Sequence, residues 1–158
     1  MRGSVFWFLL LLCGSAAAQT ISETELQAGY CLGVSTSQAE MKIAELKEEA
    51  NDPILRTYDQ DILRQIHERQ KRFQDYLSAK GFNEGSKPSS IENASERGRK
   101  DLATCKAELE HRFYKECPER CDRRYEENTD AMVDCFNRCP NPNSCNRVSK
   151  CVENFLPF

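Results

Sequence analysis

The sequence has few of the residues and motifs on which enzymes depend. It has only two histidines, His67 and His111, and neither belongs to a His-Glu-x-x-His pattern or has a third metal ligand nearby. It lacks the Gly-x-Ser-x-Gly motif of serine hydrolases and the glycine-rich loops that bind phosphate groups. Acidic residues are plentiful, but their settings mark none of them as a catalytic pair. We therefore assign no catalytic residue and no cofactor, and we expect a protein that is not an enzyme.

Long apolar runs are also lacking after residue 18. The run Val5–Leu12 is too short to cross a bilayer, which takes about 20 apolar residues. It follows Arg2 and precedes Ala16–Ala18, an order typical of a secretory signal peptide that is cleaved after its last alanine. We therefore expect a chain that starts at Gln19, in a periplasm or outside the cell, with no membrane insertion after cleavage. Cys13 would be removed with the signal peptide.

Basic residues are not in excess. The chain has 22 Lys and Arg against 25 Asp and Glu, a net charge of −3, and the two signs are interspersed. A mildly acidic chain argues against nucleic acid and anionic membranes as main partners. Another exported protein is the partner class that we retain.

Cysteine, in contrast, is abundant. The sequence has nine cysteines, and an even number remains once Cys13 is removed. Paired cysteines in an oxidising compartment form disulfides. Four such bonds, at about 2–4 kcal/mol each, would supplement a modest apolar core.

Two of the cysteine motifs are alike. Cys117-Pro-Glu-Arg-Cys121 is followed, after thirteen residues, by Cys135-Phe-Asn-Arg-Cys139. Residues four apart share one face of a helix, so two such helices folded back on each other bring four thiols into two rungs. This spacing predicts a helical hairpin stapled by Cys117–Cys139 and Cys121–Cys135.

The other four cysteines, Cys31, Cys105, Cys145 and Cys151, allow three pairings. Cys31 and Cys105 lie on the inner faces of the first and third expected helices, which favours Cys31–Cys105 and leaves Cys145–Cys151. Cys145 and Cys151 point apart on a regular helix because they are six residues apart, so this pairing needs an irregular tail. The alternative is that both tail cysteines reach back to Cys31 and Cys105.

The first expected helix runs from residue 22 to about residue 50. It begins at a capping box, Ser22–Glu25, and we favour one helix over a break at a second capping box, Ser37–Glu40. Gly29 and Gly33 weaken this helix by roughly 1 kcal/mol each relative to Ala. Because they are four apart, they would also let another backbone approach closely.

The second and third helices have clear amphipathic stripes. The second has Asp52 as its N-cap and Pro53 at its first position, and it ends at Lys80–Phe82, where a glycine suits the left-handed cap. The third begins with a capping box, Ser89–Glu92. We expect it to end before Cys117-Pro118 rather than to continue with a kink, because a proline removes a hydrogen-bond donor and crowds the preceding turn.

The remaining helices are short. We expect a first hairpin arm over residues 118–127, a second over 131–138 after an N-cap near Thr129, and a tail helix over 144–154. No strand pattern is present. The fold class is therefore all-α: an antiparallel bundle of three long helices over 19–116, then a cysteine-rich hairpin and tail over 117–158, packed with the bundle as one domain.

The span 117–139 resembles the twin-CxxxC hairpins of the α-hairpinin peptides and of the small chaperones of the mitochondrial intermembrane space. The resemblance is limited to the four cysteines as nested disulfide partners. Because α-hairpinins include plant protease inhibitors, it implies inhibition of a secreted hydrolase as one function. Those inhibitors place a basic residue in the inter-helix loop, whereas this loop reads Tyr125-Glu-Glu-Asn-Thr-Asp130, and Arg123 and Arg124 are expected on the preceding helix.

These observations favour a non-enzymatic binding or structural module. The candidate contact residues are Phe155 and Phe158 in the tail and Tyr125, Met132 and Phe136 in the hairpin. The alternative is a metal-binding or thiol-active protein that uses the CxxxC pairs, since structural zinc sites are often built from four cysteines. Disulfides are the preferred interpretation, because zinc ribbons favour CxxC and exported cysteines are normally oxidised.

Overall fold

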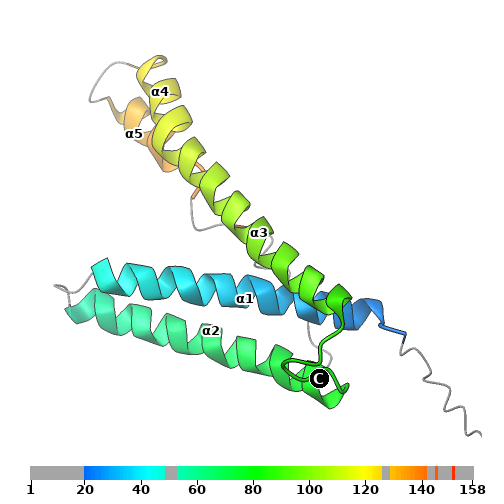
Figure 1. Ribbon diagram of the computed structural model, residues 1–158. Coiled ribbons are helices and arrows are strands. Elements are labelled where there is room, and N and C mark those ends of the chain that lie inside the picture. Colours follow the sequence, from blue (N-terminus) through cyan, green and yellow to red (C-terminus); the bar gives the residue numbers. More distant parts are fainter. Residues whose placement is uncertain (1–19, 49–52, 126–128, 142–144, 146–150, 152–158) are drawn as a thin grey trace, which may run out of the picture.

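The fold is all-α, as the sequence predicts. The computed structural model describes residues 20–48, 53–125, 129–141, 145 and 151, and every regular element within them is a helix. Figure 1 shows α1 (Glu23–Glu48) antiparallel to α2 (Pro53–Ala79), with α3 (Ser89–His111) crossing α1. α1 is the central helix, because it packs against both others, whereas no Cα atoms of α2 and α3 lie within 8 Å of each other among the described residues. No described helix has the length and apolar character that a membrane span requires.

α1 is one unbroken helix, which confirms the preferred prediction. Its capping box forms: the Ser22 N–H donates to a Glu25 carboxylate oxygen at 2.7 Å, and the Glu25 N–H donates to the Ser22 hydroxyl at 3.3 Å. The second capping sequence, Ser37–Glu40, lies inside the helix, where Glu40 binds Arg99 of α3 at 2.5 Å.

Small residues bring the backbones of α1 and α3 together. A Cβ added to Gly33 would overlap the Ser95 carbonyl, and one added to Gly98 would overlap the Tyr30 carbonyl. The close approach predicted from the glycines of α1 is therefore confirmed, and Gly98 is its counterpart on α3. Two polar contacts follow the same crossing: the Tyr30 hydroxyl donates to Asp101 at 3.1 Å, and Arg97 lies over the Tyr30 ring.

The core lies where α1 meets α2 and α3. It is formed by apolar side chains from all three helices and by three half-cystines: Ala28, Cys31, Leu32, Val34, Phe73, Leu77, Phe82, Ile91, Leu102, Cys145 and Cys151. The predicted end of α2 is confirmed. Gly81 has φ 86°, and the Phe82 N–H donates to the Leu77 carbonyl at 2.9 Å, which folds both apolar side chains into the core.

The start of α3 differs from the prediction. Ser89 is the first helical residue, Pro88 occupies the N-cap, and no side chain caps the helix. The Pro88 carbonyl accepts the N–H groups of Ile91 and Glu92, so backbone bonds take the place of the expected capping box.

The predicted break at Cys117-Pro118 is also wrong. α3 continues through a π-helical turn, η1 (Arg112–Glu116), into α4 (Cys117–Asp122), forming one rod (Figure 1). The Cys117 N–H donates to the Arg112 carbonyl, five residues back. Because a proline clashes with the carbonyl four residues before it, we attribute the wider turn to Pro118: it accommodates the ring without ending the helix. α4 ends before Arg123, earlier than expected.

The hairpin's second arm is α5 (Asp130–Asn137), beginning one residue before the predicted start. Thr129 caps it as predicted, and its hydroxyl accepts the Met132 N–H at 3.3 Å. The expected signal peptide, the Asp52 cap and most of the tail helix lie outside the described residues.

The tail cysteines reach back to the helices. The structure pairs Cys31 with Cys151 and Cys105 with Cys145, so the favoured pairs Cys31–Cys105 and Cys145–Cys151 are wrong and the alternative holds. Register is the reason. Tyr30, the neighbour of Cys31, meets Gly98 of α3, and Cys105 lies seven residues beyond Gly98, about 10 Å at the helical rise. A disulfide needs Cα atoms within about 7 Å.

Candidate functional site

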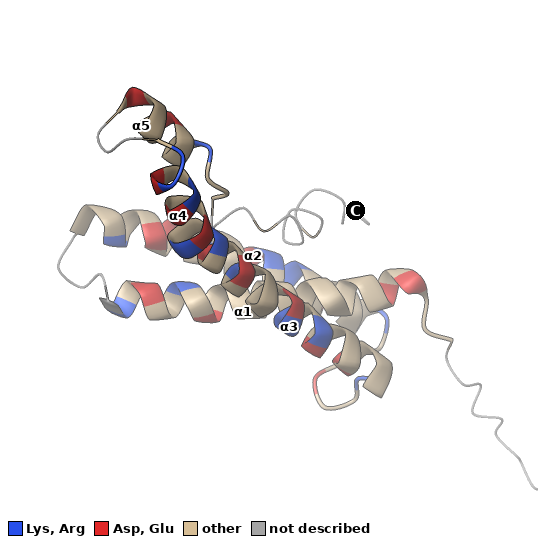
Figure 2. Ribbon diagram, turned by 90° about the horizontal axis from the view of Figure 1, so that it is seen from above, with Lys and Arg blue, Asp and Glu red and all other residues tan. Residues whose placement is uncertain are grey.

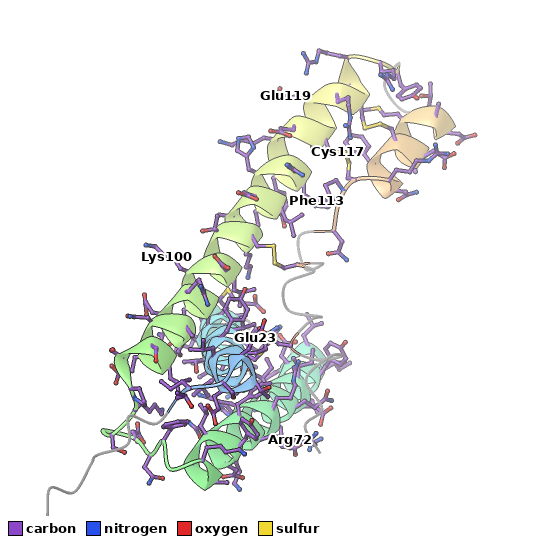
Figure 3. All side chains as sticks on the ribbon, turned by 90° about the vertical axis from the view of Figure 1, so that its right-hand side faces the viewer. Glu23, Arg72, Lys100, Phe113, Cys117 and Glu119 are labelled. Atoms are coloured by element: carbon purple, nitrogen blue, oxygen red, sulfur yellow. A yellow bond between two sulfur atoms is a disulfide. The ribbon has the colours of Figure 1, made fainter. Side chains whose placement is uncertain are left out.

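The candidate site is the stapled hairpin at the end of the rod. Cys117 pairs with Cys139 and Cys121 with Cys135, the two rungs that the spacing predicts. Figure 3 shows the yellow sulfur bonds joining α4 to α5, with Cys117 on the side of the rod that faces α5. Cys117 and Cys121 are fully buried, whereas Cys135 and Cys139 are half-buried. The two rungs therefore form the interior of a structure with too few residues for an apolar core.

The same sulfurs form the one cluster of metal-ligating atoms found within the described residues. The Sγ atoms of Cys117, Cys121 and Cys139 all lie within 4.8 Å of one another. A zinc site uses thiolates, which a disulfide consumes, so the two uses exclude each other. The hairpin can be a metal ligand set only in a reduced form of the chain.

A pocket lies beside the Cys121–Cys135 rung, between α4 and α5. It has a volume of about 440 Å³ and we call it the arginine pocket; its lining residues are Arg120, Arg124, Tyr125, Ala131, Asp134, Cys135 and Arg138. Helical spacing places two of the arginines: Arg120 lies one position before Cys121 on α4, and Arg138 lies one position before Cys139 at the end of α5. Because the rungs hold both helices, they also fix where these arginines lie relative to each other.

The charges in this region have different partners. Arg123 donates to the Glu119 carbonyl at 3.0 Å and lies 3.9 Å from its carboxylate, outside the arginine pocket. Arg120 donates to the Cys117 sulfur at 3.3 Å. For Arg124 and Arg138, no ion pair is found in the part of the chain that the structure describes. Figure 2 shows basic and acidic residues interleaved on α4, so the positive charge is local to the pocket.

The candidate contact residues of the hairpin are only partly exposed. Tyr125 is half-buried and lines the arginine pocket, and Met132 and Phe136 are half-buried on α5. Phe155 and Phe158 lie outside the described residues. The pocket could not be predicted from the sequence, because its arginines come from α4, from the residues after it and from the end of α5, which the two rungs bring together. The sequence signal that could have indicated the pocket is the arginine that directly precedes both Cys121 and Cys139.

The two histidines do not meet. His67 lies on the outer surface of α2 beside Arg64 and Glu68, and His111 ends α3, with its Nδ1 at 3.3 Å from Glu116. Neither belongs to a cluster of three or more metal-ligating groups within the described residues.

Comparison with known proteins gives no relative to reason from: the chain matches no protein-family model, no curated protein and no solved structure.

Proposed function

We propose that this chain is an exported, non-enzymatic binding module that presents its stapled hairpin to another exported protein. The observation that carries the proposal is the position of the hairpin. Within the described residues, α4 packs against η1 and α5 and makes no contact with α1 or α2 (Figure 1). The hairpin therefore does not cover the core, yet two disulfides hold it in one shape. A surface that is fixed but not needed by the core suits recognition of a partner.

Site-specific photo-crosslinking tests this proposal in the cells that make the protein. A photoreactive amino acid replaces Val133, which is 55% exposed on α5, and in a matched control it replaces Gln74, which is exposed on α2. We expect a discrete adduct with one exported protein from position 133 and none from position 74. Adducts that are the same from both positions, or no adduct from position 133, would contradict the proposal.

Export is part of the same proposal and has its own measurement. The four disulfides are the kind that oxidising compartments maintain. The intact mass of the chain purified from its own compartment should correspond to a start at Gln19, with two hydrogens fewer for every disulfide. A mass that includes residues 1–18 would refute cleavage after Ala18.

Metal binding is the second candidate, because three sulfurs of the hairpin lie within 4.8 Å of one another. It predicts free thiols and stoichiometric zinc in protein purified without reductant. Fully oxidised, zinc-free protein would exclude it and leave the binding module in place.

A further inference from the structure

The arginine pocket carries more positive than negative charge. Three arginines line it, Arg120, Arg124 and Arg138, against one acidic residue, Asp134. Asp134 has no ion pair among the described residues, so it does not neutralise any of the three at close range. Guanidinium groups bind carboxylates through paired N–H donors, and neither Arg124 nor Arg138 uses its donors for an ion pair within the described chain.

The lining also has groups that suit a peptide. Asp134 is a hydrogen-bond acceptor at the wall and can take a backbone N–H from a ligand, while the half-buried Tyr125 ring offers an apolar surface. The volume of about 440 Å³ lies toward the small end of the range for ligand sites, enough for a few side chains and not for a folded domain.

We propose that the arginine pocket binds an acidic peptide segment of the partner protein, with carboxylates of that segment seated on Arg124 and Arg138. The inference rests on the proposed function and names the chemistry of the ligand. Arg120 forms part of the wall and stays on the Cys117 sulfur. The two rungs fix the backbone positions of the arginines before the ligand arrives, so only their side chains have to be ordered on binding.

The test uses the full, oxidised chain and a short fluorescein-labelled peptide of alternating Glu and Ser, with a Gln-for-Glu peptide as the control. Binding is measured by fluorescence anisotropy at low and at physiological salt. We expect wild type to bind the acidic peptide and not the Gln-for-Glu peptide. The Arg124→Gln/Arg138→Gln variant should bind it about tenfold more weakly or worse, since two charge-assisted contacts are lost.

Arg123→Gln is the control for local charge, because it removes one positive charge next to Arg124 but outside the pocket. It should bind like wild type. Intact mass and circular dichroism confirm that each variant keeps its disulfides and helices, so a loss of binding is not a loss of fold. Equal binding by wild type and the double variant would overturn the inference.

Three further outcomes would also overturn it. Inorganic phosphate that displaces the peptide at equal concentration would assign the pocket to a small anion. An absence of binding by wild type that is relieved in Glu126→Gln/Glu127→Gln would show that the adjoining loop, which lies outside the described residues, occupies the arginines. An absence of binding in both proteins would leave the pocket without an acidic ligand.

The photo-crosslinking experiment separates this inference from the proposed function. A partner captured at position 133 by the Arg124→Gln/Arg138→Gln variant as efficiently as by wild type would keep the binding module and discard the acidic ligand. No capture by either protein would discard both.

Discussion

Single glycines decide how closely α1 and α3 cross. At most helix positions a glycine costs about 0.5–1 kcal/mol relative to alanine, so Gly→Ala substitutions usually stabilise. Gly33 and Gly98 should behave in the opposite way, because the carbonyls of Ser95 and Tyr30 occupy the space that a methyl group would take. Backbone cannot move aside as a flexible side chain can.

Gly33→Ala should therefore lower the free energy of unfolding by about 2–3 kcal/mol, the cost of overpacking. Urea denaturation followed by circular dichroism measures it. Gly29→Ala is the graded control: its Cβ would lie 3.0 Å from Ile91 atoms, so its loss should be clearly smaller. A Gly33→Ala protein as stable as wild type would mean that the helices cross less closely than described.

Glu45 joins two helices through its charge. It lies 2.6 Å from Lys42 on α1 and 3.1 Å from Lys106 on α3. Burial raises the pKa of the Glu45 carboxyl, but the hydrogen bonds and charges of the two lysines outweigh it and hold that pKa below its ordinary value of 4.5. Lys42 also reaches Asp59 of α2 at 3.2 Å, so this group of charges touches all three long helices.

The lowered pKa fixes the sign of the pH dependence. The stabilisation by ionised Glu45 is present above pH 4.5 and is lost as the pH falls through the lower pKa of the folded state. Glu45→Gln should cost less than about 1 kcal/mol at neutral pH, because the carboxylate is 37% exposed and screened by solvent. The urea midpoints of wild type and Glu45→Gln should be measured above and below pH 4.5. The difference between the two midpoints should disappear in acid. Glu68→Gln is the control. Glu68 pairs with Arg64 at a more exposed position, so this substitution should change the free energy of unfolding by less.

Among the elements, α2 is the least securely attached. It contacts α1 alone among the described helices, and no cysteine occurs in residues 32–104. Its links to α1 include the apolar contacts of Phe73 and Leu77, the Lys42–Asp59 pair, and a bond of 3.1 Å from Gln70 to the Thr36 hydroxyl. α1 and α3, in contrast, each carry a disulfide to the tail.

We expect α2 to open first. Hydrogen exchange followed by mass spectrometry should show faster exchange in the middle of α2 than in the part of α3 that crosses α1, because local unfolding starts where few contacts hold an element. Peptides covering residues 60–72 and 91–102 provide the comparison. Equal protection of the two segments would show that α2 opens only with the whole fold.

The sequence predicted the elements better than their junctions. Local signals were sufficient at Ser22, Thr129 and Gly81, where the deciding hydrogen bonds join residues close in the chain. Pro118 was misjudged because a proline can end a helix or widen it, and the choice depends on packing beyond the local turn. The rungs of the hairpin required only helical periodicity, and so they could be predicted.

At the scale of the whole molecule, the four disulfides are nested. Cys31–Cys151 encloses Cys105–Cys145, which encloses Cys117–Cys139, which encloses Cys121–Cys135, with sequence separations of 120, 40, 22 and 14. The chain runs out along the rod, turns in the hairpin and is bonded back to its own path. The sequence left this order open, because the outer pairs depend on the register between α1 and α3, which Gly33 and Gly98 set through space.

Removal of the outermost disulfide should cost the most. In the chain-entropy model, a loop of this length is worth about 5 kcal/mol, whereas the innermost bond closes a short loop inside another and should be worth less than about 3 kcal/mol. Cys31→Ala/Cys151→Ala should therefore unfold at lower denaturant than Cys121→Ala/Cys135→Ala. Non-reducing mass spectrometry verifies the remaining bonds. A larger loss from the inner pair would contradict the model.

Nesting also determines what proteolysis can do. A peptide bond broken anywhere between Cys31 and Cys151 leaves one half of that outer disulfide in each fragment, so a single cut releases nothing. Two cuts are needed to excise a segment, and α2 is the one long helix within a cysteine-free stretch. In a compartment rich in proteases, the chain can lose α2 and still keep α1, α3 and the hairpin covalently joined.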